Sequence, residues 1–289
     1  MTTWAVWAGA AILLYGVAAW GASRMLYYPM KYPAGNWEVQ ESIGARDVHL
    51  RAADGTALHA WWIERPGAKL ATIHLHGNAG NVTHRALSAE HILAAGSSVL
   101  LLDYRGYGKS EGRPSEKGLY QDAEAAFKWV LSQGFRPQQI ILHGESLGTA
   151  VATHLAAGAE VGGVILEAPL TSARAVAGRV VPVLGPLLVS GYNSLGRIKK
   201  VRAPLLVIHG DRDEVLAYDL GQELFRAANE PKTFWTIRNA THNDIHLVGR
   251  AEFSIRLAAF YRTLREQSSA LLKINPAEAS RLEAQLPEK

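Results

Sequence analysis

The chain begins with an almost uninterrupted apolar segment, and only afterwards does it alternate between short apolar runs and mixed stretches. Residues 1–23 contain no charged side chain. About 20 helical residues cross the hydrocarbon core of a bilayer, and a soluble helix normally has a polar face, which this segment lacks. The pattern predicts an N-terminal hydrophobic helix that serves as a single-pass membrane anchor.

A cleaved signal peptide is the main alternative for this segment, and a buried core helix is a second one. A signal peptide normally opens with Lys or Arg and has an apolar core of only about 7 to 15 residues. No basic residue precedes the run here, although Ala19, Gly21 and Ala22 would suit a cleavage site. Arg24 and Lys31 follow the segment, which favours a cytoplasmic catalytic domain. Cleavage would instead give a secreted or periplasmic protein.

Eight apolar runs follow, most of them continuous Val, Ile and Leu. Such runs are typical of strands that are buried on both faces of a parallel sheet. Asp54-Gly55 between the first two runs suits a tight turn, so these two strands are expected to pair antiparallel at an edge. The runs are 48–50, 58–63, 71–75, 98–102, 139–142, 161–166, 205–208 and 233–237.

Stretches of helical character separate most of these strands. They are 81–95, 115–132, 148–157, 219–227 and 250–265. Strands that alternate with helices predict an α/β fold with a mostly parallel, doubly wound sheet of eight strands. Functional groups are then expected at the carboxyl ends of the strands. Residues 266–289 are charged and rich in Ala, which predicts a helical or frayed tail without assigned chemistry.

The composition excludes several kinds of chemistry. With 48% hydrophobic and 19% charged residues in 289, the chain has the balance of a globular protein. The absence of Cys rules out disulfides, thiolate metal sites and cysteine nucleophiles. The excess of 30 Lys and Arg over 26 Asp and Glu is slight and spread along the chain, so no nucleic-acid partner is expected. Metal-ligand spacing is not found, and no cofactor is predicted.

A candidate nucleophile follows the strand at 139–142, in the motif Gly144-Glu145-Ser146-Leu147-Gly148. Small residues two before and two after the serine permit the sharp strand-to-helix turn of a nucleophile elbow. The helix that follows places the backbone N–H of Leu147 and the positive end of its dipole where an oxyanion would form. Glu145 is expected to point away from the turn, into packing or a salt bridge.

The last two strands are followed by a candidate acid and a candidate base. Because a serine hydroxyl is a weak nucleophile, it needs a base that a carboxylate orients. Asp211 and Asp213 follow the first of these strands and His242 the second, in the chain order expected of α/β-hydrolases. Either aspartate could be the acid on this ground. His246 is an alternative base, but placement directly after the last strand favours His242.

Five segments in this order resemble α/β-hydrolase-fold serine hydrolases. They are most similar to the membrane-anchored subgroup that includes the α/β-hydrolase domain-containing protein 13 and 17 types, of which the latter are protein depalmitoylases. The resemblance extends over residues 25–265, and the segments that establish it are 76–81, 103–110, 143–149, 209–213 and 241–244.

The resemblance implies particular roles for several residues. The family pattern His-Gly-x-x-Asp puts the triad acid at Asp213 and leaves Asp211 as a loop-forming carboxylate. The backbone N–H of Asn78 is expected to join that of Leu147 in the oxyanion hole, with Ala79 as the alternative. The loop 103–110 is expected to shape the site. The histidines before strand-end glycines are expected to be hydrogen-bonding loop residues, namely His76, His143 and His209.

The resemblance also implies a short lid at residues 171–203. Its Val and Leu residues predict either one helix packed over the sheet edge or an apolar wall that holds an acyl chain above Ser146. The predicted organisation is an anchor at 1–23, a hydrolase domain at 25–265 and a tail at 266–289.

The predicted activity is hydrolysis of ester or thioester bonds of a lipophilic acyl substrate through an acyl-enzyme. A peptidase resembling aminopeptidases and an inactive membrane-anchored scaffold are the alternatives.

Overall fold

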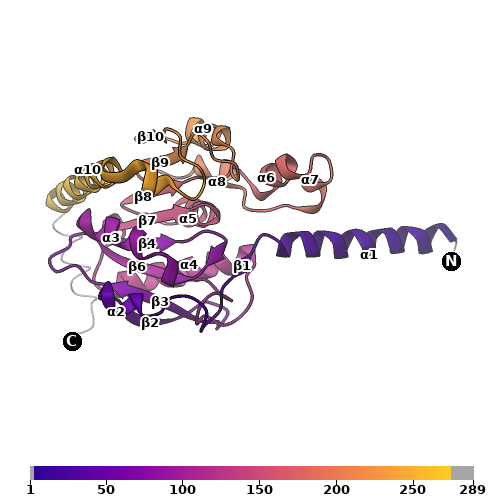
Figure 1. The fold of residues 1–289 in the computed structure, drawn as a ribbon, viewed down its shortest axis with the longest axis horizontal. Coiled ribbons are helices and arrows are strands. Elements are labelled where there is room, and N and C mark those ends of the chain that lie inside the picture. The colour runs from indigo at the N-terminus through magenta and orange to yellow at the C-terminus, as the bar shows by residue number, and fades with distance from the viewer. Residues whose placement is uncertain (1–2, 275–289) are drawn as a thin grey trace.

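The computed structural model describes residues 3–274, and its centre is an eight-stranded sheet with helices on both faces (Figure 1). The order across the sheet is β10-β9-β8-β7-β4-β6-β3-β2. Strands β10 to β6 in this order run parallel, whereas β3 is antiparallel to both β6 and β2. The predicted fold class is therefore confirmed. The strands are β2 (Arg46–Arg51), β3 (Ala57–Ile63), β4 (Ala71–Leu75), β6 (Ser98–Asp103), β7 (Ile140–Glu145), β8 (Gly163–Glu167), β9 (Leu205–Gly210) and β10 (Lys232–Ile237).

Helices cover the sheet in two sets. One face packs against α4 (Glu116–Ser132), α5 (Leu147–Gly158) and α9 (Tyr218–Ala227). The other packs against α3 (Ala86–Ala94) and α10 (Ile245–Ile274). The 3₁₀ helices Val82–His84 and Pro137–Gln139 and the short helix α2 (Val39–Ser42) lie in the connections.

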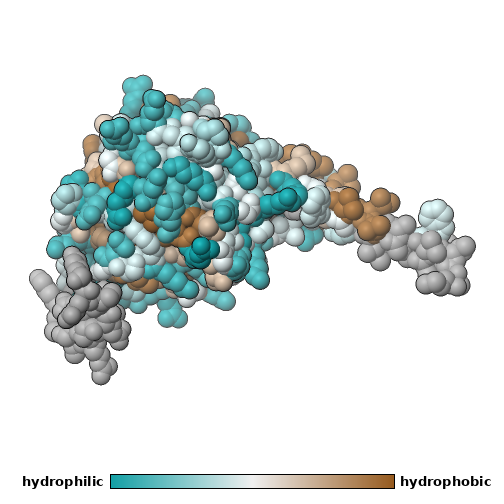
Figure 2. Space-filling view, turned by 90° about the horizontal axis from the view of Figure 1, so that it is seen from below, coloured by the Kyte–Doolittle hydropathy of each residue, from teal (hydrophilic) through white to brown (hydrophobic). Residues whose placement is uncertain are grey.

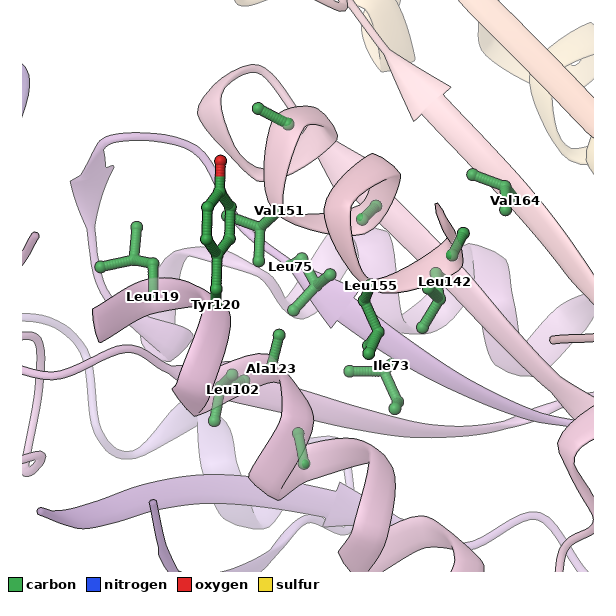
Figure 3. Close-up of a cluster of buried hydrophobic side chains, with 14 of the residues drawn as sticks. Ile73, Leu75, Leu102, Leu119, Tyr120, Ala123, Leu142, Val151, Leu155 and Val164 are labelled. Atoms are coloured by element: carbon green, nitrogen blue, oxygen red, sulfur yellow. The ribbon is translucent and has the colours of Figure 1, made fainter. Parts of the chain in front are cut away.

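The strands are apolar throughout because neighbouring residues contribute to different cores. Leu142 belongs to the core beneath α4 and α5, whereas Ile141 belongs to the core beneath α3 and α10. Figure 3 shows the first core, where Leu142 and Ile73 face Val151 and Leu155 of α5. Full burial of such a side chain stabilises the fold by roughly 1.5–3 kcal/mol. This packing fixes where each strand ends.

The edge pair β2 and β3 is joined by the predicted tight turn. Gly55 has φ of 86°, a conformation that glycine adopts without a steric penalty. The Ala52 N–H donates to the Thr56 carbonyl at 3.0 Å, and the Thr56 N–H donates to Asp54 Oδ1 at 3.2 Å. The pairing places Leu50 opposite Leu58, so both apolar side chains enter the same core.

The N-terminal segment forms helix α1 (Thr3–Arg24), which projects from the body of the molecule (Figure 1). Among residues 3–274, no helix combines the length and the apolar character needed to cross a membrane. The predicted single-pass anchor is therefore not supported. Residues 1 and 2 of the predicted anchor lie outside the described residues.

The chain after α1 returns to the body as a short strand that the sequence did not predict. Strand β1 (Tyr28–Pro29) pairs in parallel with β5 (Ala79–Gly80), in the loop that follows β4. The Tyr27 hydroxyl also forms a 2.7 Å hydrogen bond with that of Tyr192. The segment beyond α1 is thus attached both to the loop after β4 and to the end of the lid region.

The lid region consists of three short helices rather than one packed helix. They are α6 (Ala173–Val180), α7 (Gly185–Leu188) and α8 (Ser194–Ile198). Apolar residues of α6, α7 and their connection are exposed, including Val183 and Leu187. The Tyr15 hydroxyl of α1 donates to the Leu187 carbonyl at 2.6 Å. Helices α1 and α7 therefore lie side by side.

The C-terminal helix is longer than predicted. Helix α10 includes residues 266–274, which the sequence assigns to the tail, and residues 275–289 lie outside the described part of the chain. Its helical geometry is interrupted at Arg250, where φ is 46° and ψ is −134°.

Candidate active site

Ser146 occupies a strained turn between β7 and α5. Its φ of 53° and ψ of −117° are rarely adopted by a residue with a side chain. A Cβ on Gly144 would lie 2.6 Å from the Gly148 carbonyl oxygen, and a Cβ on Gly148 would overlap the Leu75 carbonyl oxygen. Only glycine fits at both positions, which is the steric reason for the motif around the serine.

Three of the predicted residues meet at the carboxyl ends of β7, β9 and β10. His242 Nε2 lies 3.1 Å from Ser146 Oγ, and His242 Nδ1 lies 2.8 Å from Asp213 Oδ2. Ser146 follows β7, Asp213 follows β9, and His242 lies between β10 and α10. The three side chains form a continuous hydrogen-bonded row from hydroxyl to imidazole to carboxylate.

The Asp213 carboxylate is buried and accepts several hydrogen bonds. Its Oδ1 accepts from the backbone N–H groups of Val215 at 2.9 Å and Leu216 at 2.7 Å. Its Oδ2 lies 3.2 Å from His209 Nε2 in addition to His242. Burial raises the pKa of Asp213, but the hydrogen bonds from His209 and His242 outweigh it and leave the pKa well below its usual range. Asp213 is therefore ionised at neutral pH.

The two alternatives left by the sequence lie elsewhere. The exposed Asp211 accepts a hydrogen bond from the Asn239 N–H through Oδ1 at 2.6 Å. It therefore holds the segment that leads to His242. His246 Nε2 lies 3.0 Å from Glu167 Oε2. The geometry thus brings Asp213 and His242 into one row with the serine and gives Asp211 and His246 other partners.

The two predicted oxyanion donors, Leu147 and Asn78, belong to segments that come close to Ser146. Leu147 is the first residue of α5, where a backbone N–H has no intrahelical acceptor. Asn78 follows Gly77, whose Cβ position would lie 3.4 Å from Ser146 Cβ. The Asn78 carbonyl accepts from the Tyr28 N–H at 2.9 Å and the Tyr107 hydroxyl at 2.7 Å, which fixes that side of the loop.

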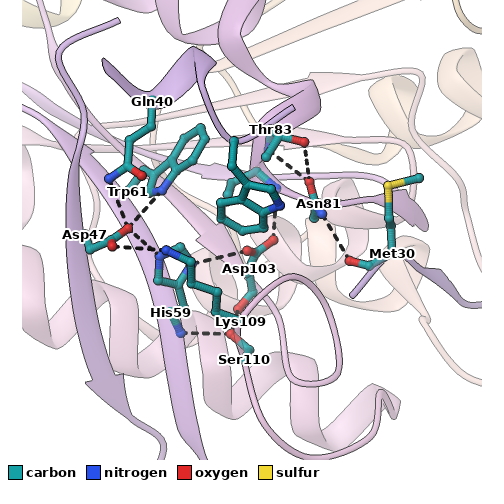
Figure 4. A network of polar contacts seen from close by, with 12 residues as sticks. Met30, Gln40, Asp47, His59, Trp61, Asn81, Thr83, Asp103, Lys109 and Ser110 are labelled. Carbon is teal, nitrogen blue, oxygen red and sulfur yellow. Dashed lines mark hydrogen bonds and ion pairs between the residues drawn. The ribbon is translucent and has the colours of Figure 1, made fainter. Parts of the chain in front are cut away.

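A polar network that extends from the buried Asp103 to the exposed Asp47 holds the far end of the same loop (Figure 4). Asp103 Oδ1 accepts the Val82 N–H at 2.9 Å, and Asp103 Oδ2 lies 3.3 Å from His59 Nδ1. His59 Nε2 is in turn 2.8 Å from Asp47 Oδ1. Asn81 Nδ2 donates to the Met30 carbonyl at 3.1 Å. The loop 103–110 and the segment after α1 thus both hold the loop that follows β4.

The remaining polar residues near the strand ends are paired mainly with one another. Glu145 forms a salt bridge with Arg85 at 3.0 Å, as the sequence predicts. The Ser146 N–H donates to the Glu167 carbonyl at 2.9 Å, and the Glu167 carboxylate contacts His143 and His246. Sequence reasoning missed Glu167. The available signal was a carboxylate directly at the end of an otherwise apolar strand.

Groups of three or more His, Asp or Glu side chains arranged to hold a metal ion are not found within residues 3–274.

Comparison with known proteins identifies the family. Residues 67–195 match the hydrolase family model described as "Serine aminopeptidase, S33". The uncharacterized protein Rv2307c of Mycobacterium tuberculosis is 39% identical over 249 residues, which cover 84% of this chain and 87% of that one. The chain belongs to the α/β-hydrolase family. This α/β-hydrolase is also 35% identical over 190 residues to the human α/β hydrolase domain-containing protein 17B, with 64% of each chain covered.

A solved structure agrees with this assignment at the level of the fold. The esterase Pf2001 of Pyrococcus furiosus superimposes with a TM-score of 0.70 at 24% identity, covering 82% of this α/β-hydrolase and 98% of the esterase. The family match, the similar sequences and this fold together confirm the resemblance drawn from the sequence motifs, and the chain is a hydrolase.

Proposed function

We propose that this α/β-hydrolase cleaves carboxylic ester or thioester bonds of lipophilic acyl substrates. Ser146 is the nucleophile, His242 the general base, and Asp213 the carboxylate that orients the base. The observation that supports these roles is the hydrogen-bonded row of 3.1 Å and 2.8 Å contacts, built from the ends of three strands. The esterase Pf2001, which shares the fold, supports an ester substrate.

The proposed reaction proceeds through an acyl-enzyme. His242 Nε2 takes the hydroxyl proton as Ser146 Oγ attacks the carbonyl carbon, and the ionised Asp213 stabilises the imidazolium that forms. The N–H groups of Leu147 and Asn78 bind the oxyanion. His242 then gives its proton to the departing alcohol or thiol. Water attacks the acyl-enzyme with His242 again as base, which releases the acid and restores Ser146.

A lipophilic acyl group is supported by the apolar surface of the lid and α1. Exposed side chains of the lid lie next to α1, whose described part also exposes Leu13, Leu14 and Val17, and brown apolar surface is visible where the coloured part of this helix leaves the body (Figure 2). Contiguous exposed apolar surface marks sites of contact with apolar partners. The exposed lid residues are Val180, Val181, Val183, Leu184 and Leu187.

An amide substrate is the second candidate, and the description of the matched family model as a serine aminopeptidase favours it. The same three residues would serve, with an amine as leaving group. The two candidates differ in which substrate the site turns over faster, so a direct comparison of substrates separates them.

The test compares p-nitrophenyl esters from acetyl to palmitoyl, an acyl thioester and aminoacyl p-nitroanilides on purified protein. We expect ester or thioester turnover that increases with acyl length and disappears in Ser146→Ala. Ser132→Ala, which alters an exposed serine at the end of α4, is the matched control and should retain activity. Preference for the anilides would establish the peptidase alternative. Complete absence of Ser146-dependent turnover would leave the inactive scaffold.

A further inference from the structure

The buried carboxylate of Glu167 joins the two elements that position Ser146 and His242. Glu167 ends β8 and is only 3% exposed. Its Oε1 lies 2.6 Å from Nε2 of His143, a residue of β7 that precedes Ser146 by three positions. Its Oε2 lies 3.0 Å from Nε2 of His246, which is four residues after His242. One side chain thus connects the strand of the nucleophile with the segment of the base.

The charges around this carboxylate favour an ion pair. Burial raises the pKa of Glu167, but His246 and His143 outweigh it and leave the pKa well below its usual range. Burial lowers the pKa of His246, but Glu167 outweighs that effect and raises it. Among the neighbouring groups, Glu145 also raises the pKa of His246 and Arg85 lowers it.

The second nitrogen of the His246 ring has its own partner on α3. His246 Nδ1 lies 3.0 Å from His91 Nδ1, and the two ring planes differ by 2°. Burial and the neighbouring His246 both lower the pKa of His91, which favours a neutral His91 that accepts a hydrogen bond from His246. A protonated His246 therefore donates through both ring nitrogens, one to a carboxylate and one to a neutral imidazole.

The segment that bears His242 is fixed at both ends. On the side of β10, the Asn239 N–H is bound by Asp211, from the loop that also carries Asp213. On the side of α10, His246 is bound by Glu167, from the strand beside β7. The first contact holds the His242 segment against the loop of Asp213. The second holds it against the strand next to the one that leads to Ser146.

We propose that the Glu167–His246 ion pair positions His242 within hydrogen-bond reach of Ser146, so that both are positioning residues of the reaction. This inference rests on the proposed function, because it assigns Ser146 and His242 their roles. Removal of the ion pair releases the α10 end of the His242 segment while Asp213 continues to hold His242 Nδ1. A displacement of about 1 Å between reacting groups costs up to about 100-fold in rate.

The experiment measures kcat and KM for a p-nitrophenyl ester in His246→Ala, His246→Gln and Glu167→Gln, with active sites counted by an organophosphate titration. We expect kcat per titrated site to fall about 10- to 100-fold in His246→Ala and KM to stay within about twofold. His246→Gln should recover much of the rate, because its amide N–H can still donate to Glu167 Oε2.

The matched control is His154→Ala. His154 lies on α5, and its partly buried ring stacks on that of Tyr120. A purely structural role for His246 predicts a lower melting temperature and an unchanged kcat per titrated site, as in the control. That result would overturn the inference. If His246→Ala does not fold, wild-type kcat in Glu167→Gln overturns it equally. Full activity of Ser146→Ala would instead contradict the proposed function itself.

Discussion

Two apolar regions of this α/β-hydrolase resemble each other in sequence and differ in their surroundings. In the sheet, Leu142 of β7 is fully buried in the core that α4 and α5 cover. In the lid, Leu187 is 52% exposed and Val183 is 76% exposed. The apolar composition of the two regions is therefore similar, and only their contacts show that one is a buried core and the other an exposed surface.

The difference separates two tasks of the molecule. The buried region fixes the strand ends and with them the row formed by Ser146, His242 and Asp213. The exposed region lies beside α1 and contributes nothing to that row among the described contacts. We infer that the first region determines the chemistry and the second the choice of acyl group. The following variants test this separation.

Substitution Asp213→Asn tests the chemistry of the strand ends. An amide cannot hold the His242 tautomer or stabilise its positive charge, so kcat for ester hydrolysis should fall by about 10⁴-fold. Asp211→Asn is the control, because an amide oxygen can still accept the Asn239 N–H, and it should change kcat by less than about tenfold. Comparable losses in the two variants would remove Asp213 from its proposed role.

Substitution Leu142→Ala tests the buried region as a core. It should lower the free energy of unfolding by about 2–5 kcal/mol, because it removes buried methyl groups and leaves a cavity. Leu187→Ala, on the exposed lid, should change it by less than about 0.5 kcal/mol. Urea unfolding of the two variants measures the difference. Equal losses would mean that α7 belongs to the core.

The free energy of unfolding at low pH tests whether the buried carboxylate of Glu167 is ionised in the folded protein. Glu167 has a folded-state pKa well below its unfolded value of about 4.3, so its stabilisation is present above that pH and is lost as pH falls toward the folded-state value. Wild-type stability should therefore fall with decreasing pH below about 4 more steeply than that of Glu167→Gln. Urea unfolding midpoints of wild type and Glu167→Gln, measured across this pH range, give the comparison. The same pH dependence in both proteins would argue against an ionised Glu167.

Polar substitutions in the lid should give the smallest effect. The double variant Val183→Ser and Leu187→Ser should reduce the preference for palmitoyl over acetyl esters by about tenfold, which corresponds to about 1.4 kcal/mol for the two lost apolar contacts together. The rate with the acetyl ester should stay unchanged. A parallel decrease with both esters would show that these side chains support the site instead of selecting the acyl chain.

Much of the fold was predictable because its signals are local or ordered along the chain. Continuous apolar runs indicate strands buried on both faces, and each polar motif directly after such a run marks a carboxyl end. Between Asp211 and Asp213, only the family resemblance favours Asp213, because the spacing allows either aspartate. The structure supplies its physical reason, since Asp213 binds the amides of Val215 and Leu216 and thereby turns its Oδ2 toward His242.

Other features depend on partners that hydropathy does not specify. The length and apolar composition of α1 predict a membrane span, which the structure does not support. The pairing of Tyr28 with Ala79 joins segments far apart in sequence. Glu167 and His246 meet only because β8 lies beside β7 and α10 begins above their ends. Such long-range contacts leave no periodic pattern in a single sequence.

The most direct measurement is the site of covalent labelling by a fluorophosphonate, located by mass spectrometry of peptides from the intact protein. We expect one adduct on Ser146, with no labelling in folded Ser146→Ala and strongly slowed labelling in Asp213→Asn. An adduct on another residue, or undiminished labelling of Ser146→Ala, would contradict the assignment of Ser146 as the nucleophile.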